Sequence, residues 1–439
     1  MVTLGCDKNR IDAELMLGDL ADKGYNIVND ENIADVLIIN TCGFIDAAKQ
    51  ESIDNILEMA GKKETGRCKA LIACGCLAER YGGELLSEIP ELDAVVGTGD
   101  FMELDAVIRS VLEGASGIKR IGNTEYDVDF RGNRVLTTPP YIAYVKISEG
   151  CSNNCSYCII PKLRGRYRSR SMDNILDEVR TLSAGGVKEV ILVAEDTSKY
   201  GVDIYGRKML PQLLRNISLI DGIEWIRVLY CYPEGIDPEL IDEMRMNDKV
   251  CKYIDIPLQH IDNKILRSMR RASNRESIEN LIRTLREEID GISIRTTFIV
   301  GYPGETEAQF KELYDFIAEY RLDRVGVFMY SREEDTDAAA MDGQISERVK
   351  KLRQRKLMEL QREISYENNR KKIGSVLKVL VEGEADGMLS ARSYADAPKI
   401  DGRVYIKKGS ADVGNFADVK ITGCSDYDLV GEIVYESCK

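Results

Sequence analysis

The chain has 439 residues, and its 60 Lys and Arg against 74 Asp and Glu give a net charge of −14 at pH 7. No apolar run approaches the roughly 20 residues that span a bilayer, which excludes a membrane protein, and the acidic balance opposes nucleic acid unless one face is locally basic. Because the chain exceeds what one hydrophobic core usually serves, we expect two or three domains.

Residues 1–115 alternate strand and helix patterns. The strands are continuous apolar runs, as in a parallel sheet that is buried on both faces, and an amphipathic helix over residues 12–23 ends at Gly24. We therefore predict an N-terminal open parallel α/β sheet, with strands at residues 1–4, 35–40, 70–73 and 94–96.

A polar, Gly-containing stretch over residues 113–133 shows neither the helical nor the strand periodicity of apolar residues and is interpreted as a linker. Residues 134–372 then contain six strand-like runs, the first five each followed by a helix, and end in a charged helix over residues 346–372. Consecutive β-α units with right-handed crossovers predict a partial TIM-like (β/α)6 barrel with its site at the carboxyl ends of the strands. The runs are residues 141–147, 189–194, 225–230, 253–258, 294–300 and 325–330.

Residues 375–439 contain short β-patterned runs between Gly and Asp turns, which predicts a small C-terminal β-barrel. The runs are residues 376–381, 403–406, 418–421 and 429–434. The predicted fold class is thus α/β with a terminal β-barrel.

The chain contains 12 cysteines and one histidine, His260. Its first ten residues lack the pattern of a secretory signal, so we expect a reducing, cytoplasmic location without disulfides. A single imidazole disfavours His-rich zinc sites and Ser-His or Cys-His catalysis. Some of the cysteines are therefore expected to bind iron as thiolates.

Cys151, Cys155 and Cys158 have C-x3-C-x2-C spacing directly after the first predicted barrel strand. A structural zinc ion would require a fourth ligand, and no neighbouring Cys or His supplies one. A 4Fe-4S cluster with three thiolates leaves one iron open, which can chelate the amino and carboxylate groups of S-adenosylmethionine (SAM). The spacing favours this cluster over a zinc scaffold or three structural cysteines.

Cys6, Cys42 and Cys76 each follow the end of a predicted strand in the first domain. The carboxyl ends of neighbouring parallel strands lie together, so these thiols can converge on one metal centre. The alternative is that they are ordinary buried cysteines, and Cys74 competes with Cys76 for the third position.

These segments resemble motifs of a known family. The segment around Cys151 resembles the radical-SAM signature, and the whole chain resembles the radical-SAM methylthiotransferases. Leu-Gly-Cys6-Asp-Lys-Asn, Asn-Thr-Cys42-Gly-Phe and Gly-Cys76-Leu-Ala-Glu-Arg are similar to the ligand motifs of that family's auxiliary cluster. The resemblance implies two 4Fe-4S clusters, SAM as cofactor, Cys76 rather than Cys74 as third ligand, and a TRAM-like C-terminal barrel that recognises the substrate.

Further residues at the barrel strands are candidates for the SAM pocket. Resemblance to radical-SAM barrels implies contacts to SAM from Gln259, Arg295 and residues 301–305, including Gly301 and Glu305. Glu195 follows a strand end and either contacts SAM or stabilises the rim through hydrogen bonds. A basic run after the cysteine loop is either a solvated face or a SAM or substrate contact; it comprises Arg164, Arg166, Arg168 and Arg170.

Two branches of the family differ in substrate: one modifies an adenosine in transfer RNA, the other the β-carbon of an aspartate in small-subunit ribosomal protein twelve. Residues 375–439 carry 8 Lys and Arg against 11 Asp and Glu, a net charge of −3, which suits a basic ribosomal protein better than RNA. Several segments resemble the ribosomal-protein branch more closely: Leu4–Asn9, Arg168–Arg170, Ile256–His260, Tyr394–Pro398 and Ser425–Leu429.

The resemblance implies that two SAM molecules are used, one as methyl donor and one as radical source, with no obligatory side-chain acid or base. It also implies a reducing electron donor and a sulfur source as partners. The alternatives are the same chemistry on transfer RNA and a non-catalytic iron-sulfur electron carrier that binds ribosomes.

Overall fold

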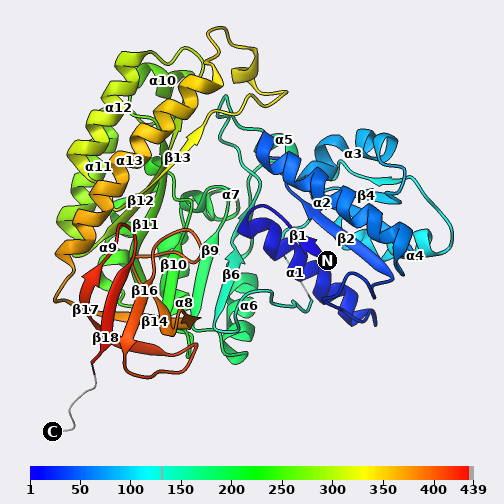
Figure 1. The fold of residues 1–439 in the computed structure, drawn as a ribbon, viewed down its shortest axis with the longest axis horizontal. Coiled ribbons are helices and arrows are strands. Elements are labelled where there is room, and N and C mark those ends of the chain that lie inside the picture. Colours follow the sequence, from blue (N-terminus) through cyan, green and yellow to red (C-terminus); the bar gives the residue numbers. More distant parts are fainter. Residues whose placement is uncertain (130–131, 435–439) are drawn as a thin grey trace.

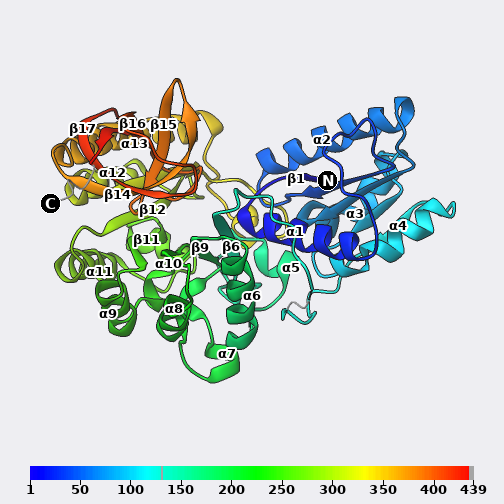
Figure 2. The same ribbon diagram turned by 90° about the horizontal axis from the view of Figure 1, so that it is seen from below.

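The computed structural model describes residues 1–129 and 132–434 and contains three units (Figure 1). The central unit joins the other two: the N-terminal unit lies beside its first strand, β6 (Ile142–Lys146), and the C-terminal barrel packs against residues at the starts of the central strands, among them Tyr141, Lys188 and Trp225 (Figure 1 and Figure 2). The predicted fold class, a mixed α/β chain that ends in a small β-barrel, is confirmed.

The N-terminal unit is a five-stranded parallel sheet in the order β1-β2-β3-β4-β5. Hydrophobic clusters lie on both of its faces, which explains the continuous apolar runs of β2 and β3. The strands are β1 (Val2–Thr3), β2 (Val36–Thr41), β3 (Ala70–Gly75), β4 (Ala94–Val96) and β5 (Ile118–Arg120), and the helices are α1 (Asp7–Asp22), α2 (Asp46–Thr65), α3 (Cys76–Glu88), η1 (Phe101–Glu103) and α4 (Leu104–Leu112).

Two predictions about this unit are corrected. Strand β5 pairs with β4 inside residues 113–133, which we predicted as a linker, because a three-residue edge strand is too short to give a periodic pattern. Helix α1 begins at Asp7 rather than at residue 12. Its first turns bury Lys8, Asn9 and Asp12 against the central unit, so they lack the apolar stripe that marks a helix in sequence.

The central unit contains six parallel strands in the order β13-β12-β11-β10-β9-β6, as predicted for a partial barrel. The apolar side chains of these strands pack against the crossover helices in one large core, and α13 covers β13 and α12. The strands are β6 (Ile142–Lys146), β9 (Glu189–Val193), β10 (Trp225–Val228), β11 (Val250–Gln259), β12 (Ser293–Val300) and β13 (Arg324–Met329).

The helices of this unit are α5 (Ile160–Arg164), α6 (Met172–Ala184), α7 (Val202–Tyr205), α8 (Leu210–Ser218), α9 (Pro238–Met246), α10 (Asn263–Ser268), α11 (Arg275–Glu288), α12 (Glu307–Tyr320) and α13 (Glu347–Lys371), with η2 (Thr197–Lys199), η3 (Pro233–Gly235) and η4 (Asp337–Ala340). A two-stranded ribbon, β7 (Ser148–Glu149) and β8 (Arg168–Ser169), encloses the cysteine loop between its strands. This ribbon fixes both ends of that loop.

The C-terminal unit is a closed barrel in the order β14-β15-β16-β18-β17. We did not predict β15, because Met-Leu-Ser-Ala-Arg-Ser shows no alternation of apolar and polar residues. Residues 435–439 of the predicted unit lie outside the described residues. The strands are β14 (Val376–Ala385), β15 (Met388–Ser393), β16 (Val404–Lys408), β17 (Phe416–Cys424) and β18 (Leu429–Ile433).

A buried ion cluster attaches this barrel to the central unit. Glu189, fully buried at the start of β9, accepts hydrogen bonds from Arg227 of β10 over 2.8 Å and from Arg392 of β15. Trp225, the only tryptophan, packs edge to face on Phe416 of β17 with ring centroids 4.8 Å apart. The barrel is therefore held by charge and by aromatic packing.

None of the helices within residues 1–129 and 132–434 has both the length and the apolar character of a membrane-spanning segment.

We predict that Arg392→Met weakens this attachment by about 3–5 kcal/mol, because it leaves the buried Glu189 carboxylate with one cation fewer. The measurement is the free energy of the urea transition followed by the fluorescence of Trp225, which lies in the contact. Lys378→Met is the matched control: Lys378 bonds Glu224 across the same contact over 3.0 Å, but both side chains are nearly half exposed, and the cost should stay below about 1 kcal/mol. Equal costs for both variants would contradict the prediction.

Candidate functional site

The structure brings Cys6, Cys42 and Cys76 together at the carboxyl edge of the N-terminal sheet. Cys6 is the N-cap of α1, Cys42 follows β2, and Cys76 is the first residue of α3 directly after β3. Burial raises the pKa of the Cys76 thiol to about 12, and the nearby sulfurs of Cys6 and Cys42 act in the same direction. This set is called the first cysteine trio below.

Two glycines make room for this trio. A Cβ on Gly5 would lie 2.7 Å from the Cβ of Cys42, so the absence of a side chain lets the chain before α1 approach the turn after β2. Gly75 has φ +90° and ψ −155°, a conformation that is essentially restricted to glycine. Cys74, in contrast, points into the hydrophobic core with its sulfur 3.9 Å from that of Met16, so it does not face the other thiols.

The second cysteine trio, Cys151, Cys155 and Cys158, lies in the loop that follows β7. The amide of Cys151 donates to the carbonyl of Gly165 over 3.1 Å, and the amide of Cys158 donates to the carbonyl of Cys155 over 3.1 Å. Burial raises the pKa of the Cys151 thiol to about 11, and Glu195 and Cys155 also raise it. The loop therefore holds three thiols in one buried neighbourhood.

The chemistry of the two trios suits iron-sulfur clusters. In the described part of the chain no three His, Cys, Asp or Glu side chains lie close enough to share one metal ion. A 4Fe-4S cluster does not require that, because each thiolate binds a different iron of the cube. All six cysteines are free thiols, and a set of three thiolates leaves one iron open. That these six residues bind clusters remains a prediction.

Two side chains that the sequence did not single out enclose Cys155. The guanidinium of Arg271 and the hydroxyl of Tyr232 each lie 3.9 Å from its sulfur, and Arg271 stacks on the Tyr232 ring 4.0 Å from the centroid. Arg271 is 6% exposed. These contacts place a buried, positively charged side chain beside one thiol, and no motif around Arg271 marks it in the sequence.

The residues predicted for the SAM pocket occupy two different surroundings. Gln259 ends β11 with φ 73°, and Gly301 follows β12 with φ 73°, so both form sharp turns at the carboxyl ends of strands. The carboxylate of Glu305 accepts hydrogen bonds from the Gly301 amide and from Arg353 of α13, and it faces His260 over 3.3 Å. Glu305 thus fixes the turn, and a contact from it to SAM remains a prediction.

Arg295 and Glu195 are engaged by other units. Arg295 bonds Asp255 over 2.7 Å and lies 3.6 Å from Asp401 of the C-terminal barrel. Glu195 lies 3.6 Å from the ammonium of Lys8 on α1, and burial raises its pKa against the opposing charge of Lys8. Their predicted contacts to SAM are likewise untested.

The basic run after the cysteine loop is not one surface. The side chain of Arg166 is 80% exposed and pairs with Glu125, whereas that of Arg164 is 1% exposed. Arg170 is buried and bonds Glu178 over 2.6 Å. The four arginines therefore do not form one solvated face, because Arg164 ends helix α5, Arg166 lies in the following loop and Arg170 follows the short strand β8. A contact from this run to SAM or substrate stays a prediction.

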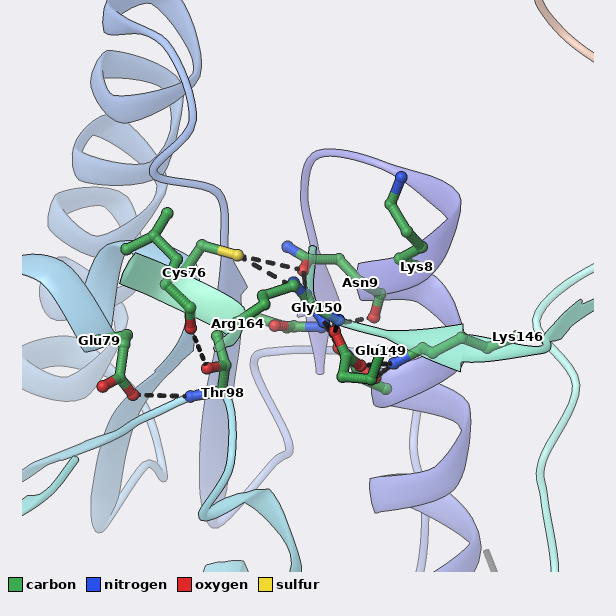
Figure 3. Close-up of polar contacts among 12 residues, drawn as sticks. Lys8, Asn9, Cys76, Glu79, Thr98, Lys146, Glu149, Gly150 and Arg164 are labelled. Carbon is green, nitrogen blue, oxygen red and sulfur yellow. Dashed lines mark hydrogen bonds and ion pairs between the residues drawn. The ribbon is translucent and has the colours of Figure 1, made fainter. Parts of the chain in front are cut away.

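A buried polar network joins the N-terminal unit to the central unit (Figure 3). Arg164 donates to Asp12 of α1 over 3.0 Å and to Glu149 of β7 over 3.1 Å. Lys146 of β6 donates to both of these carboxylates. Although burial opposes ionisation, Lys146 and Arg164 lower the pKa of Glu149 below its usual range. Through Arg164 this network contacts Cys76 of the first trio, and its member Glu149 lies two residues before Cys151 of the second.

We predict that Gly75→Ala displaces Cys76. A Cβ would lie 2.5 Å from the Asn40 side-chain oxygen and 2.8 Å from the Thr41 carbonyl, and the backbone conformation adds about 1–3 kcal/mol of strain. The measurements are the thermal unfolding midpoint and the iron bound per chain after anaerobic reconstitution, and both should fall.

The matched control is Gly83→Ala in α3. Its Cβ would meet only the end of the Lys119 side chain at 3.4 Å, and alanine in a helix interior stabilises by about 0.5–1 kcal/mol. Full iron content in Gly75→Ala would contradict the proposed need for glycine at this turn.

Three family models match successive parts of the chain. The model described as "Uncharacterized protein family UPF0004" matches residues 1–97, the Radical SAM superfamily matches residues 145–317, and the TRAM domain matches residues 373–434. These matches correspond to the sheet unit, most of the central strands and the terminal barrel.

A solved structure of similar fold is the radical S-adenosylmethionine methyltransferase TsrM from Kitasatospora setae, described with cobalamin and a 4Fe-4S cluster bound. It has a TM-score of 0.56 and 15% sequence identity, and the match covers 88% of this chain and 78% of that one. At this identity the likeness concerns the fold alone.

Much closer in sequence are two proteins that carry the name ribosomal protein uS12 methylthiotransferase RimO. The protein from Thermoanaerobacter sp. (strain X514) is 55% identical over 433 residues, which cover 98% of this chain and 99% of the relative. The protein from Clostridium kluyveri is 52% identical over 441 residues, which cover 100% and 98% respectively. By this similarity along its whole length, the chain belongs to the RimO family of ribosomal protein uS12 methylthiotransferases.

Proposed function

We propose that this protein is a radical-SAM methylthiotransferase that inserts a methylthio group at the β-carbon of an aspartate in ribosomal protein uS12. The observation that carries the proposal is the presence of two cysteine trios at the carboxyl ends of two adjoining parallel sheets. A radical generator alone needs only the second trio. The first trio adds a metal centre that can hold sulfur, next to the site where the radical would form.

The six cysteines would hold two 4Fe-4S clusters, with Cys151, Cys155 and Cys158 at the radical site and Cys6, Cys42 and Cys76 at the sulfur site. When bound, SAM and the clusters supply the radical, the methyl group and the sulfur. The chain supplies orientation and shelter. The Gly301 turn, held by Glu305 and Arg353, and the strained end of β11 at Gln259 would shape the SAM pocket.

Shelter from water comes from the buried surroundings of the thiols. Arg271 and Tyr232 cover Cys155, and the Lys8 ammonium lies over the Tyr230 ring at 3.9 Å, which closes the space between α1 and the end of β10. Exclusion of water prevents side reactions of a reactive intermediate. No side-chain acid or base is required by this chemistry, which suits a chain with one histidine whose ring bonds Glu305 and the Asp262 amide.

The C-terminal barrel would recognise the ribosomal protein. Residues 375–439 are acidic, with a net charge of −3, and opposite charge steers a Lys- and Arg-rich partner and disfavours RNA. A low-potential electron donor and a sulfur source complete the set of partners, and the reaction would take place in the cytoplasm, where the ribosome is assembled.

The substrate is tested by incubating the reconstituted enzyme, SAM, reductant and sulfide with uS12 or with transfer RNA. We expect mass spectrometry to detect one methylthio group in place of a hydrogen on an aspartate of uS12. A methylthio gain on RNA and none on uS12 would overturn the substrate assignment. Formation of 5'-deoxyadenosine in neither reaction would favour an electron carrier.

Single substitutions distinguish the role of the second trio in SAM cleavage from the role of the first trio in sulfur insertion. Cys155→Ala should reduce SAM cleavage to the background of cluster-free protein, because the radical site loses a ligand. Cys42→Ala should retain cleavage but lose sulfur insertion. Both are measured by chromatography of 5'-deoxyadenosine beside mass spectrometry of uS12. Cys424→Ala, in the C-terminal barrel, is the control and should retain both activities. Equal radical formation in Cys155→Ala and the parent would refute the assignment.

A further inference from the structure

The side chain of Arg164 links the two cysteine trios. Arg164 ends helix α5, six residues after Cys158 of the second trio, yet its guanidinium lies against Cys76 of the first. Its Nη2 atom donates to the Cys76 sulfur over 3.6 Å and to the side-chain oxygen of Asn9 (Figure 3). One segment of chain thus holds one trio and contacts the other.

The guanidinium cannot easily rotate away from this sulfur. Its Nη1 atom donates to Asp12 over 3.0 Å and to Glu149 over 3.1 Å, and its Nε atom lies 3.9 Å from Glu195. These carboxylates come from three different elements, namely α1, β7 and the end of β9. Because the fork of a guanidinium is rigid, fixing two of its nitrogens also fixes the direction of the third.

Apolar packing excludes water from the same contact. Ile159 and Leu163, on either side of the first turn of α5, form a buried cluster with Cys76. The carbonyl of Leu163 accepts a hydrogen bond from the Thr98 hydroxyl over 2.6 Å, which ties α5 to the N-terminal unit. In such surroundings the positive charge of Arg164 is weakly screened, so its effect on the sulfur is stronger than at a surface.

Charge in this neighbourhood is balanced before any thiolate is counted. The carboxylates of Asp12, Glu149 and Glu195 are matched by three cations that contact them, namely Lys8, Lys146 and Arg164. Metal-bound thiolates therefore bring the excess negative charge. Of these three cations, Arg164 is the one with a hydrogen bond to a cysteine sulfur.

We propose that Arg164 is a positioning residue that fixes Cys76 and raises the reduction potential of the cluster held by the first trio. The inference rests on the proposed function, because it requires a cluster at Cys6, Cys42 and Cys76. Reduction adds negative charge to the cluster, and a hydrogen bond to a ligating sulfur together with a nearby cation stabilises the reduced form more than the oxidised form. The segment that carries the radical site thereby tunes the sulfur site.

The test is a redox titration of the first-trio cluster by electron paramagnetic resonance. The background is the full chain with Cys151, Cys155 and Cys158 replaced by Ala, so that only one cluster contributes to the signal. Arg164→Gln should make reduction at least tenfold less favourable, a fall in midpoint potential of at least about 59 mV for one electron. Arg164→Lys keeps the positive charge but not the forked guanidinium, so its midpoint potential should lie between those of the parent and of Arg164→Gln.

Arg166→Gln is the matched control, because this arginine is two residues away and 80% exposed, and its midpoint should equal that of the parent. If Arg164→Gln does not fold, the proposal is tested by the midpoint potential of Arg164→Lys and by deuterium exchange at the cluster. In deuterated buffer the parent should show an exchangeable deuteron coupled to the reduced cluster by electron-nuclear double resonance, and Arg164→Lys should lose this coupling.

Two results would overturn the proposal. An unchanged midpoint in Arg164→Gln and Arg164→Lys, with the cluster present, would contradict the role of Arg164 and leave the proposed function intact. A parent background that binds no cluster at the first trio would contradict the proposed function and this inference together.

Discussion

The buried ionic contact around Arg164 is the interaction on which the relation between the two cysteine trios depends. Asp12 belongs to the N-terminal unit, whereas Lys146, Glu149 and Arg164 belong to the central unit, and all four side chains are at most 8% exposed. Burying such a set is unfavourable unless every charge has a partner, so the contact tolerates essentially one relative placement of the two units. Distance and orientation between the trios follow from that placement.

This contact also explains the unusual character of helix α1. One face of α1 packs on the sheet that carries the first trio, and its polar residues are buried toward β6 and Glu195. The carboxyl ends of two parallel sheets therefore face a common space with α1 beside it. Ligand sites of open α/β sheets lie at such ends, and here two of them adjoin, which brings a candidate sulfur site next to a candidate radical site.

A second buried ion cluster sets the position of the C-terminal barrel. Glu189 pairs with Arg227 and Arg392 in this cluster. In addition, Asp396 forms an ion pair with Arg324 of β13, and Asp401 accepts a hydrogen bond from the Tyr253 hydroxyl over 2.8 Å. The segment between β15 and β16 thus reaches the inner side of β11, β12 and β13. These buried contacts hold the barrel in one position on the central unit, so it is not a module attached only by a linker.

The sequence alone determined the elements whose signals are local. Continuous apolar runs identified the buried parallel strands, and the spacing of Cys151, Cys155 and Cys158 identified the cysteine loop, because both patterns arise within a few neighbouring residues. The first trio was accessible by the rule that parallel strand ends lie together. Resemblance selected Cys76 as the third ligand; in the structure Cys74 points into the core, whereas Cys76 lies beside Cys6 and Cys42, and cluster binding by Cys76 stays a prediction.

Only the tertiary structure decided what the polar residues do. Arg164 and Arg166 look alike in sequence, yet Arg164 is buried against Cys76 and Asp12, which lie 88 and 152 residues earlier in the chain, whereas Arg166 is solvated beside Glu125. Arg271 beside Cys155 and Glu305 within its turn were likewise undetermined. Burial and pairing of charges depend on which units meet, and that information does not reside in any local stretch of the chain.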